Sequence, residues 1–213
     1  MDIATKFLLM VLILLNFSAL ASSRMKAVIR LTAIQGAVLG LLLLSVHRHF
    51  GITIILMCLL TITIKSIIIP HLLDRAMREV NIRREVEPIL GFVPSLALGG
   101  ASTAFAFYFS QALPLADPHP SSLIPPASIS TIFAGFLFLT TRTKAISQVL
   151  GYLILENGIF VFGLLLVGKI PFMVEIGVLL DLFVAVFVMG IILNHIQRTF
   201  SSIDMDILSE LKE

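Results

Sequence analysis

Long apolar segments dominate the sequence, and the last two of them each carry a carboxylate near the middle. These segments run over residues 145–167 and 172–196, with Glu156 in the first and Asp181 in the second. At about 1.5 Å per residue, both carboxylates lie roughly 15 to 18 Å from the turn that joins the segments, near the midplane of a bilayer whose hydrocarbon core is ~30 Å thick. An acid at that depth is costly and normally faces a bundle interior or a water-filled cavity. The pair therefore indicates an ion or proton path.

The overall composition is that of an integral membrane protein. Hydrophobic residues make up 58% of the chain and charged residues only 13%, against about 25% charged residues in a soluble domain. A net charge of +2 does not suggest a nucleic-acid partner. The single cysteine, Cys58, offers no pair for a disulfide, an iron–sulfur cluster or a zinc site, and the five histidines form no metal motif. We expect no resident metal and no cofactor.

Seven segments are long and apolar enough to cross a bilayer, which predicts an all-α, polytopic membrane protein with about seven transmembrane helices. A four-helix region over residues 1–113 comes first, followed by an external proline-rich loop over 114–126. A three-helix region over 127–196 and a cytoplasmic tail over 197–213 complete the chain. The expected spans cover residues 3–21, 31–46, 52–70, 89–113, 127–141, 145–167 and 172–196. Small residues in the fourth span predict a close-packing face for a neighbouring helix: Gly99, Gly100, Ala101, Ser102 and Ala104.

Lysine and arginine are distributed unevenly between alternate loops. Eleven of them follow spans one, three and five or lie in the tail, whereas three lie in the N-terminus and the remaining loops. Because cytoplasmic loops carry an excess of Lys and Arg, we place the N-terminus outside and the C-terminus in the cytoplasm. Lys6, the apolar run after it and the small residues Ala19 and Ala21 also resemble a secretory signal. We favour a retained first span, since six spans follow and the topology needs no cleavage.

Four further ionisable residues lie in or near the spans. Lys65 comes five residues before Pro70, where a lost backbone hydrogen bond should kink the helix; it either snorkels towards the cytoplasmic interface or joins a charged relay. Glu175 lies roughly 120° around the helix from Asp181 and either snorkels to the outer interface or supplements the path. His71 and His195 are either interfacial residues or a cytoplasmic extension of the relay.

Two runs in the last spans resemble a known family. The runs GYLILENGIFVFGLLL from Gly151 and VEIGVLLDLFVAVFVMGIILNHI from Val174 resemble hydrogenase-4 membrane component E, a subunit of formate-hydrogenlyase-type and related group 4 hydrogenases. The tail DMDILSELKE is similar to that of the K-type subunit of respiratory complex I, a three-span protein with a glutamate in each of two helices. By this likeness residues 127–196 correspond to the K-type core, and Asp181 or Glu175 takes the place of the second glutamate.

The resemblance implies a non-redox subunit of a complex I-like hydrogenase in a prokaryotic cytoplasmic membrane. Its implied partners are antiporter-like membrane subunits and a peripheral hydrogenase arm, and its carboxylates would serve proton or sodium translocation coupled to electron transfer. The chain itself contains no nucleotide loop, no cluster ligands and no nucleophile with a base, so we expect no catalysis in isolation. The alternatives are a subunit of a related Mrp-antiporter-type assembly, a stand-alone transporter and a purely structural scaffold.

Overall fold

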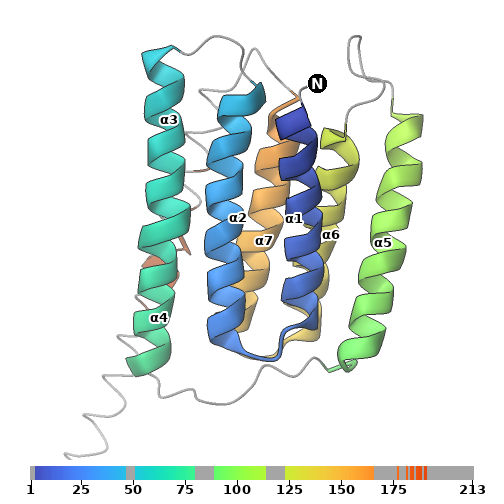
Figure 1. Ribbon diagram of the computed structural model, residues 1–213. Helices are drawn as coiled ribbons and strands as arrows, with labels where there is room; N and C mark the ends of the chain where they lie inside the picture. The colour runs from blue at the N-terminus through green and yellow to red at the C-terminus, as the bar shows by residue number, and fades with distance from the viewer. Residues whose placement is uncertain are drawn as a thin grey trace, which may run out of the picture.

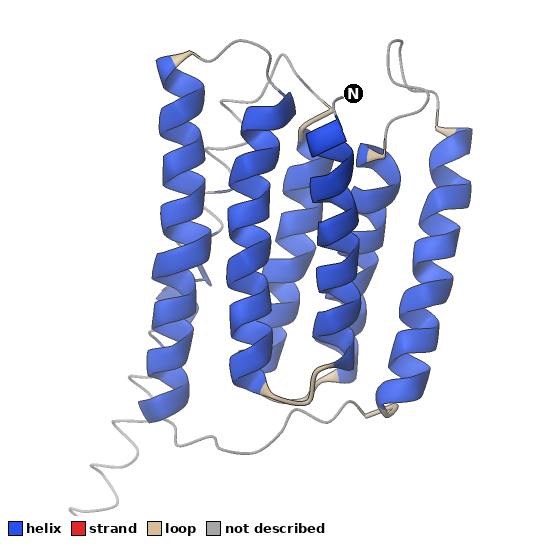
Figure 2. Cartoon of the chain, viewed as in Figure 1, coloured by secondary structure: helices blue, strands red, loops and turns tan. Residues whose placement is uncertain are grey.

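The structure is a computed structural model that describes residues 3–46, 51–79, 89–113 and 123–165, together with eight isolated residues between Gly177 and Gly190. Every regular element within these residues is a helix (Figure 2). Six helices within the described ranges are long and apolar enough to cross a membrane. The prediction of an all-α, multi-pass membrane protein is therefore confirmed for this part of the chain. The seventh predicted span falls mostly outside the described residues, and the orientation of the chain in the membrane stays a prediction.

The helices follow the apolar spans closely, with differences at four boundaries. Helix α2 (Met25–Val46) begins about six residues before the predicted span, and α5 (Phe92–Ala112) begins about three residues after the predicted start. The third span continues without interruption to the end of α4 (Ile69–Glu79). Helix α6 begins ahead of the predicted boundary because Pro125 and Pro126 lie in its first turn, where an N–H has no intrahelical partner to lose. The elements are α1 (Ile3–Ala21), α2 (Met25–Val46), α3 (Ile52–Ile62), η1 (Thr63–Ile68), α4 (Ile69–Glu79), α5 (Phe92–Ala112), α6 (Ile124–Thr141) and α7 (Ala145–Gly163).

Four helices occupy the centre of the protein and the others lie at two opposite edges. Helices α1, α2, α6 and α7 are central, the continuous unit α3–η1–α4 lies at one edge and α5 at the other (Figure 1). The α1–α2 turn, the α6–α7 turn, the end of α4 and the start of α5 all lie at the same end of the bundle. This end, called the basic end below, carries Arg24, Lys26, Arg30, Arg75, Arg78, Arg142 and Lys144. The alternate-loop count predicts that it faces the cytoplasm.

Glycines allow α6 and α7 to approach each other closely. A Cβ on Gly158 would lie 2.6 Å from the backbone nitrogen of Ile132, and a Cβ on Gly151 would lie 2.7 Å from that of Leu139. The small residues of α5 are used only in part. A Cβ on Gly99 would lie 2.7 Å from Leu20 of α1, whereas Gly100 faces open space. Close packing through small residues is a usual way for membrane helices to associate.

Element η1 is a short π-helix placed immediately before α4. The N–H of Ile69 bonds to the carbonyl of Ile64, five residues earlier, and Pro70 follows directly. Because proline has no N–H and its ring displaces the preceding turn, a widened π turn is a regular way to pass this position. The predicted break at Pro70 thus takes the form of a π-helical segment within one continuous helix. Lys65 lies inside it.

Candidate functional site

A polar layer separates two apolar clusters in the middle of the bundle. On α1, Leu12 belongs to one cluster and Ala19 to the other, with Asn16 between them; on α2, Gln35 lies in the same way between Ile29 and Val38. Helices α6 and α7 and the continuous α3–η1–α4 unit repeat the arrangement. The buried polar residues of this layer are Asn16 (α1), Gln35 (α2), Lys65 (η1), Thr131 (α6), Glu156 and Asn157 (α7) and Asp181.

Three of these residues form a buried charged cluster, here called the triad. The Nζ atom of Lys65 lies 2.6 Å from Oε1 of Glu156 and 3.0 Å from Oδ1 of Asp181. The relative exposure of the three residues is 5%, 3% and 3%. These distances are those of charge-assisted hydrogen bonds. Lys65 therefore bridges two carboxyl groups that reach it from different segments of the chain.

Close packing positions each member of the triad. Gly36 lets α2 approach the π-helix, because a Cβ there would lie 2.7 Å from Cβ of Lys65 and 2.9 Å from its carbonyl carbon. Glu156 is carried by α7, which Gly158 holds against α6. Asp181 is followed by Val184 and Val188, which are buried in the apolar cluster nearer the basic end. All three side chains are therefore almost completely buried.

The charge balance of the triad determines its chemistry. An ammonium and two carboxylates together carry a net charge of −1, and an uncompensated buried charge is strongly disfavoured. One proton on either carboxyl group makes the cluster neutral. Oε2 of Glu156 is buried without a hydrogen-bond partner among the described residues, so this oxygen offers a place for the proton. The arrangement can thus hold and release a single proton.

A chain of side-chain hydrogen bonds begins beside the triad and crosses the central helices. Asn157, next to Glu156, donates to Oε1 of Gln35 at 3.2 Å. Gln35 donates to Oδ1 of Asn16 at 2.9 Å, and Asn16 donates to Oγ1 of Thr131 at 2.8 Å. At the neighbouring position on α6, Ser130 lies 2.8 Å from the hydroxyl of Thr103 on α5. The polar layer therefore reaches from the edge formed by η1 to the edge formed by α5.

The structure brings together three of the six predicted site residues. Lys65, Glu156 and Asp181 form the triad, in which Lys65 is buried and paired instead of snorkelling to the interface; a charged relay through it stays a prediction. His71 is an exposed residue of α4 and is not part of the buried cluster. Glu175 and His195 lie outside the described residues. In the part of the chain that is described, no three His, Cys, Asp or Glu residues gather to hold a metal ion.

Sequence reasoning missed the amide chain and one buried arginine. Asn16 and Gln35 are uncharged, and only their position in the middle of apolar spans could have drawn attention to them. Arg142 is among the basic residues that the sequence predicts in loops, and it is only 2% exposed in the structure. Burial lowers the pKa of its guanidinium to about 10, so that it stays charged at neutral pH. It lies 4.8 Å from the ring centroid of Phe138 and donates from Nη2 to the carbonyl of Leu20 at 3.3 Å.

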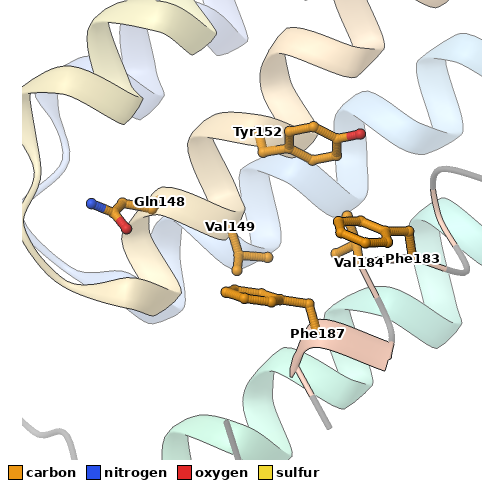
Figure 3. A pocket seen from close by; sticks show the side chains of 6 residues that line it. All are labelled: Gln148, Val149, Tyr152, Phe183, Val184 and Phe187. Carbon is orange, nitrogen blue, oxygen red and sulfur yellow. The ribbon is translucent and has the colours of Figure 1, made fainter. Parts of the chain in front are cut away.

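An apolar groove lies beside the segment that carries Asp181. It has a volume of about 210 Å³ and is bounded by Val149 and Tyr152 of α7 and by Phe183 and Phe187 (Figure 3). Phe183 and Phe187 are 65% and 51% exposed. Exposed aromatic residues beside membrane-spanning helices are expected to meet lipid tails, and the polar side chains that line the groove are those of Gln148 and Tyr152.

The helices and their buried polar layer define the class of this protein, a multi-pass α-helical membrane protein with a charged cluster in its interior. The chain is 32% identical over 191 residues to the uncharacterized protein Rv0085 of Mycobacterium tuberculosis, which covers 89% of this chain and 87% of the relative. It is 27% identical over 150 residues to hydrogenase-4 component E of Escherichia coli K12 and of Shigella flexneri, which covers 70% of this chain and 68% of each relative.

No family model matches the chain. No solved structure matches it either. The chain belongs to the same family as Rv0085 and is a distant homologue of hydrogenase-4 component E. The resemblance predicted from its last two spans is confirmed as distant homology.

Proposed function

We propose that the protein is a non-redox membrane subunit of a complex I-like hydrogenase of the hydrogenase-4 type. In this role Lys65, Glu156 and Asp181 contribute to proton or sodium translocation that is coupled to electron transfer. The distant homology to component E supports membership of such an assembly. The single observation that carries the role in ion transfer is the buried triad, in which one lysine bridges two carboxyl groups.

The proposed mechanism follows from the charge balance of the triad. In the resting state the cluster is neutral, with Lys65 protonated, one carboxylate and one carboxylic acid. Release of the proton leaves a net charge of −1 in a dry environment, which strongly favours uptake of another cation. If the neighbouring redox module opens the triad to opposite sides in turn, each cycle transfers one proton. A sodium ion bound between the two carboxylates would satisfy the same charge balance.

The amide chain fits a supporting role beside the triad. Amides cannot carry a titratable proton, but Asn157 holds the end of the chain next to Glu156, and Gln35 is adjacent to Gly36, which packs on Lys65. A displacement of α2 would therefore act on both Lys65 and Asn157. We propose that α2 couples the position of Lys65 to that of α7, and that antiporter-like subunits of the same complex receive the transferred charge.

The test is the coupled activity of the whole complex in sealed vesicles. Electron transfer and ion uptake are measured for the wild type, Glu156→Gln and Asp181→Asn, with assembly checked by co-purification. Glu79→Gln, in the last residue of α4, makes the same chemical change away from the triad and serves as the control. The proposal predicts that the complexes with either triad variant assemble and lose ion uptake, whether or not electron transfer continues. The complex with Glu79→Gln should keep both electron transfer and ion uptake.

The amide variants keep the hydrogen-bonding capacity of the acids but cannot carry a proton, so they separate transfer from scaffolding. Full electron transfer and full ion uptake in both Glu156→Gln and Asp181→Asn would make the subunit a structural scaffold. Ion uptake measured with and without sodium, at constant pH, distinguishes sodium transport from proton transport. A purified single chain that transports ions without partners would instead indicate a stand-alone transporter.

A further inference from the structure

A second polar feature lies between α2 and α4, at the basic end of the bundle and away from the triad. A groove of about 250 Å³ separates the two helices there. Its lining residues on α2 follow the spacing i, i+3, i+4 and i+7, and those on α4 the spacing i, i+4 and i+8, so each helix presents one face to the groove. They are Lys26, Ile29, Arg30 and Ala33 on α2 and Pro70, Asp74 and Arg78 on α4.

The groove is charged at one end and apolar at the other. Lys26 lies in the first turn of α2 and Arg78 in the last turn of α4, and both turns are at the basic end. Ala33 and Pro70 lie deeper, towards the middle of the bundle. There the hydroxyl of Ser66 donates to the carbonyl of Ala33 at 2.8 Å, which joins α2 to η1 and closes the inner end. The groove thus has a cationic mouth and an apolar floor.

The charges at the mouth are only partly compensated. Arg78 donates to Asp74 from Nε at 3.0 Å and from Nη2 at 2.6 Å, so these two side chains form a neutral pair. Lys26 and Arg30 are exposed, and neither forms an ion pair within the described part of the chain. Two positive charges therefore remain at the entrance, and Arg78, paired with Asp74, lies on the opposite helix.

We propose that this groove binds an anionic phospholipid, with its headgroup phosphate between Lys26 and Arg30 and its acyl chains leaving along Ile29 and Ala33 into the bilayer. Basic pockets between membrane helices suit anionic headgroups, and guanidinium groups bind phosphate particularly well. A free phosphate ion would need the cations but not the apolar floor. The proposal is independent of the role of the triad, which lies deeper in the bundle.

The predicted membrane topology alone accounts for an excess of basic residues at this end, so a basic residue outside the groove is needed as a control. Arg24 is that residue. It is exposed, lies in the turn just before α2 and does not line the groove. If lipids were held only by diffuse attraction to a basic surface, Arg24 would matter as much as Arg30. A specific lipid site in the groove predicts a larger loss of lipid affinity when Arg30 is replaced than when Arg24 is replaced.

The experiment measures binding of dioleoylphosphatidylglycerol to the purified full-length protein in detergent by native mass spectrometry. Dioleoylphosphatidylcholine, with the same chains and a zwitterionic headgroup, is the reference lipid. We expect preferential binding of phosphatidylglycerol, a loss of roughly fivefold in affinity for Arg30→Gln and roughly 25-fold for the double variant Lys26→Gln/Arg30→Gln, and less than about twofold for Arg24→Gln. All these positions are exposed, and circular dichroism verifies that helix content is unchanged.

Three results would overturn the proposal. Equal binding of the two lipids would exclude recognition of the headgroup. Equal losses in Arg24→Gln and Arg30→Gln would reduce the effect to diffuse surface attraction. Displacement of phosphatidylglycerol by millimolar inorganic phosphate would identify a site for the free ion instead of a lipid.

Discussion

Replacing Gly36 by alanine tests how closely α2 approaches the triad without changing any polar group. The new Cβ would lie 2.7 Å from Cβ of Lys65, 2.9 Å from its carbonyl carbon and 3.0 Å from its carbonyl oxygen. An ordinary contact begins near 3.4 Å, so α2 and η1 must separate by about 0.7 Å. Two of the three atoms belong to the backbone, and a change of rotamer cannot relieve the contact.

The loss of stability in Gly36→Ala is measured relative to a matched variant, Gly100→Ala. Overpacking in a close helix contact costs about 1–3 kcal/mol. Alanine also improves helix propensity by up to about 1 kcal/mol, and Gly100→Ala measures that gain, because a Cβ at Gly100 meets nothing within 4 Å. We therefore expect Gly36→Ala to be less stable than Gly100→Ala by about 1–3 kcal/mol.

The assay is thermal unfolding of the purified protein in detergent, in which this difference corresponds to a lower midpoint by roughly 2 to 12 °C. In the assembled complex Gly36→Ala should also reduce ion uptake, because Lys65 moves away from contacts of 2.6 Å to Glu156 and 3.0 Å to Asp181. Equal midpoints for Gly36→Ala and Gly100→Ala would refute the close contact, and with it the argument that α2 positions Lys65.

Three further changes test the rest of the polar layer and the buried arginine, each by unfolding in detergent. Gln35→Leu removes two hydrogen bonds of the amide chain and should lower the free energy of unfolding by about 1–2 kcal/mol. Gln148→Leu, at an exposed position, should change it little. Equal effects of the two substitutions would show that the amide chain does not stabilise the protein. Arg142→Lys keeps the positive charge but loses the planar guanidinium near Phe138, and it should lower the free energy of unfolding by about 1 kcal/mol. Arg24→Lys, at an exposed position, should leave the free energy of unfolding nearly unchanged. An unchanged stability of Arg142→Lys would contradict a stabilising contact with Phe138. In a double-mutant cycle of Lys65→Met and Glu156→Gln, the double variant should be more stable than additivity predicts by at least about 1 kcal/mol; strict additivity would show that the two groups do not interact.

Most of what could be predicted from the sequence depends on the length of the apolar segments and on the ionisable residues within them. Six predicted spans correspond to helices, because a segment of that length and composition has few alternatives to a membrane helix. Glu156 and Asp181 could be singled out because a carboxylate at midspan is costly wherever it lies. The interpretation of Lys65 stayed open, since its partners are 91 and 116 residues away and periodicity does not reveal which helices meet.

Features that depend on packing between distant helices could not be predicted. The amide chain joins residues of α1, α2, α6 and α7, and none of its members carries a charge that would mark it. The burial of Arg142 depends on the approach of Leu20 and Phe92 from other helices. The proline-rich loop predicted over residues 114–126 includes the first turn of α6, because Pro125 and Pro126 predict a helix break, although the start of a helix tolerates them.

The central claim is that the triad holds one exchangeable proton. Infrared spectroscopy of the purified protein in lipid at neutral pH tests it directly, through the carbonyl stretch of a protonated carboxylic acid and its shift in heavy water. The wild type should show one buried acid, and both Glu156→Gln and Asp181→Asn should lose it, because the remaining carboxylate is neutralised by Lys65. A wild type without a protonated acid, or an acid that persists in both variants, would contradict the account.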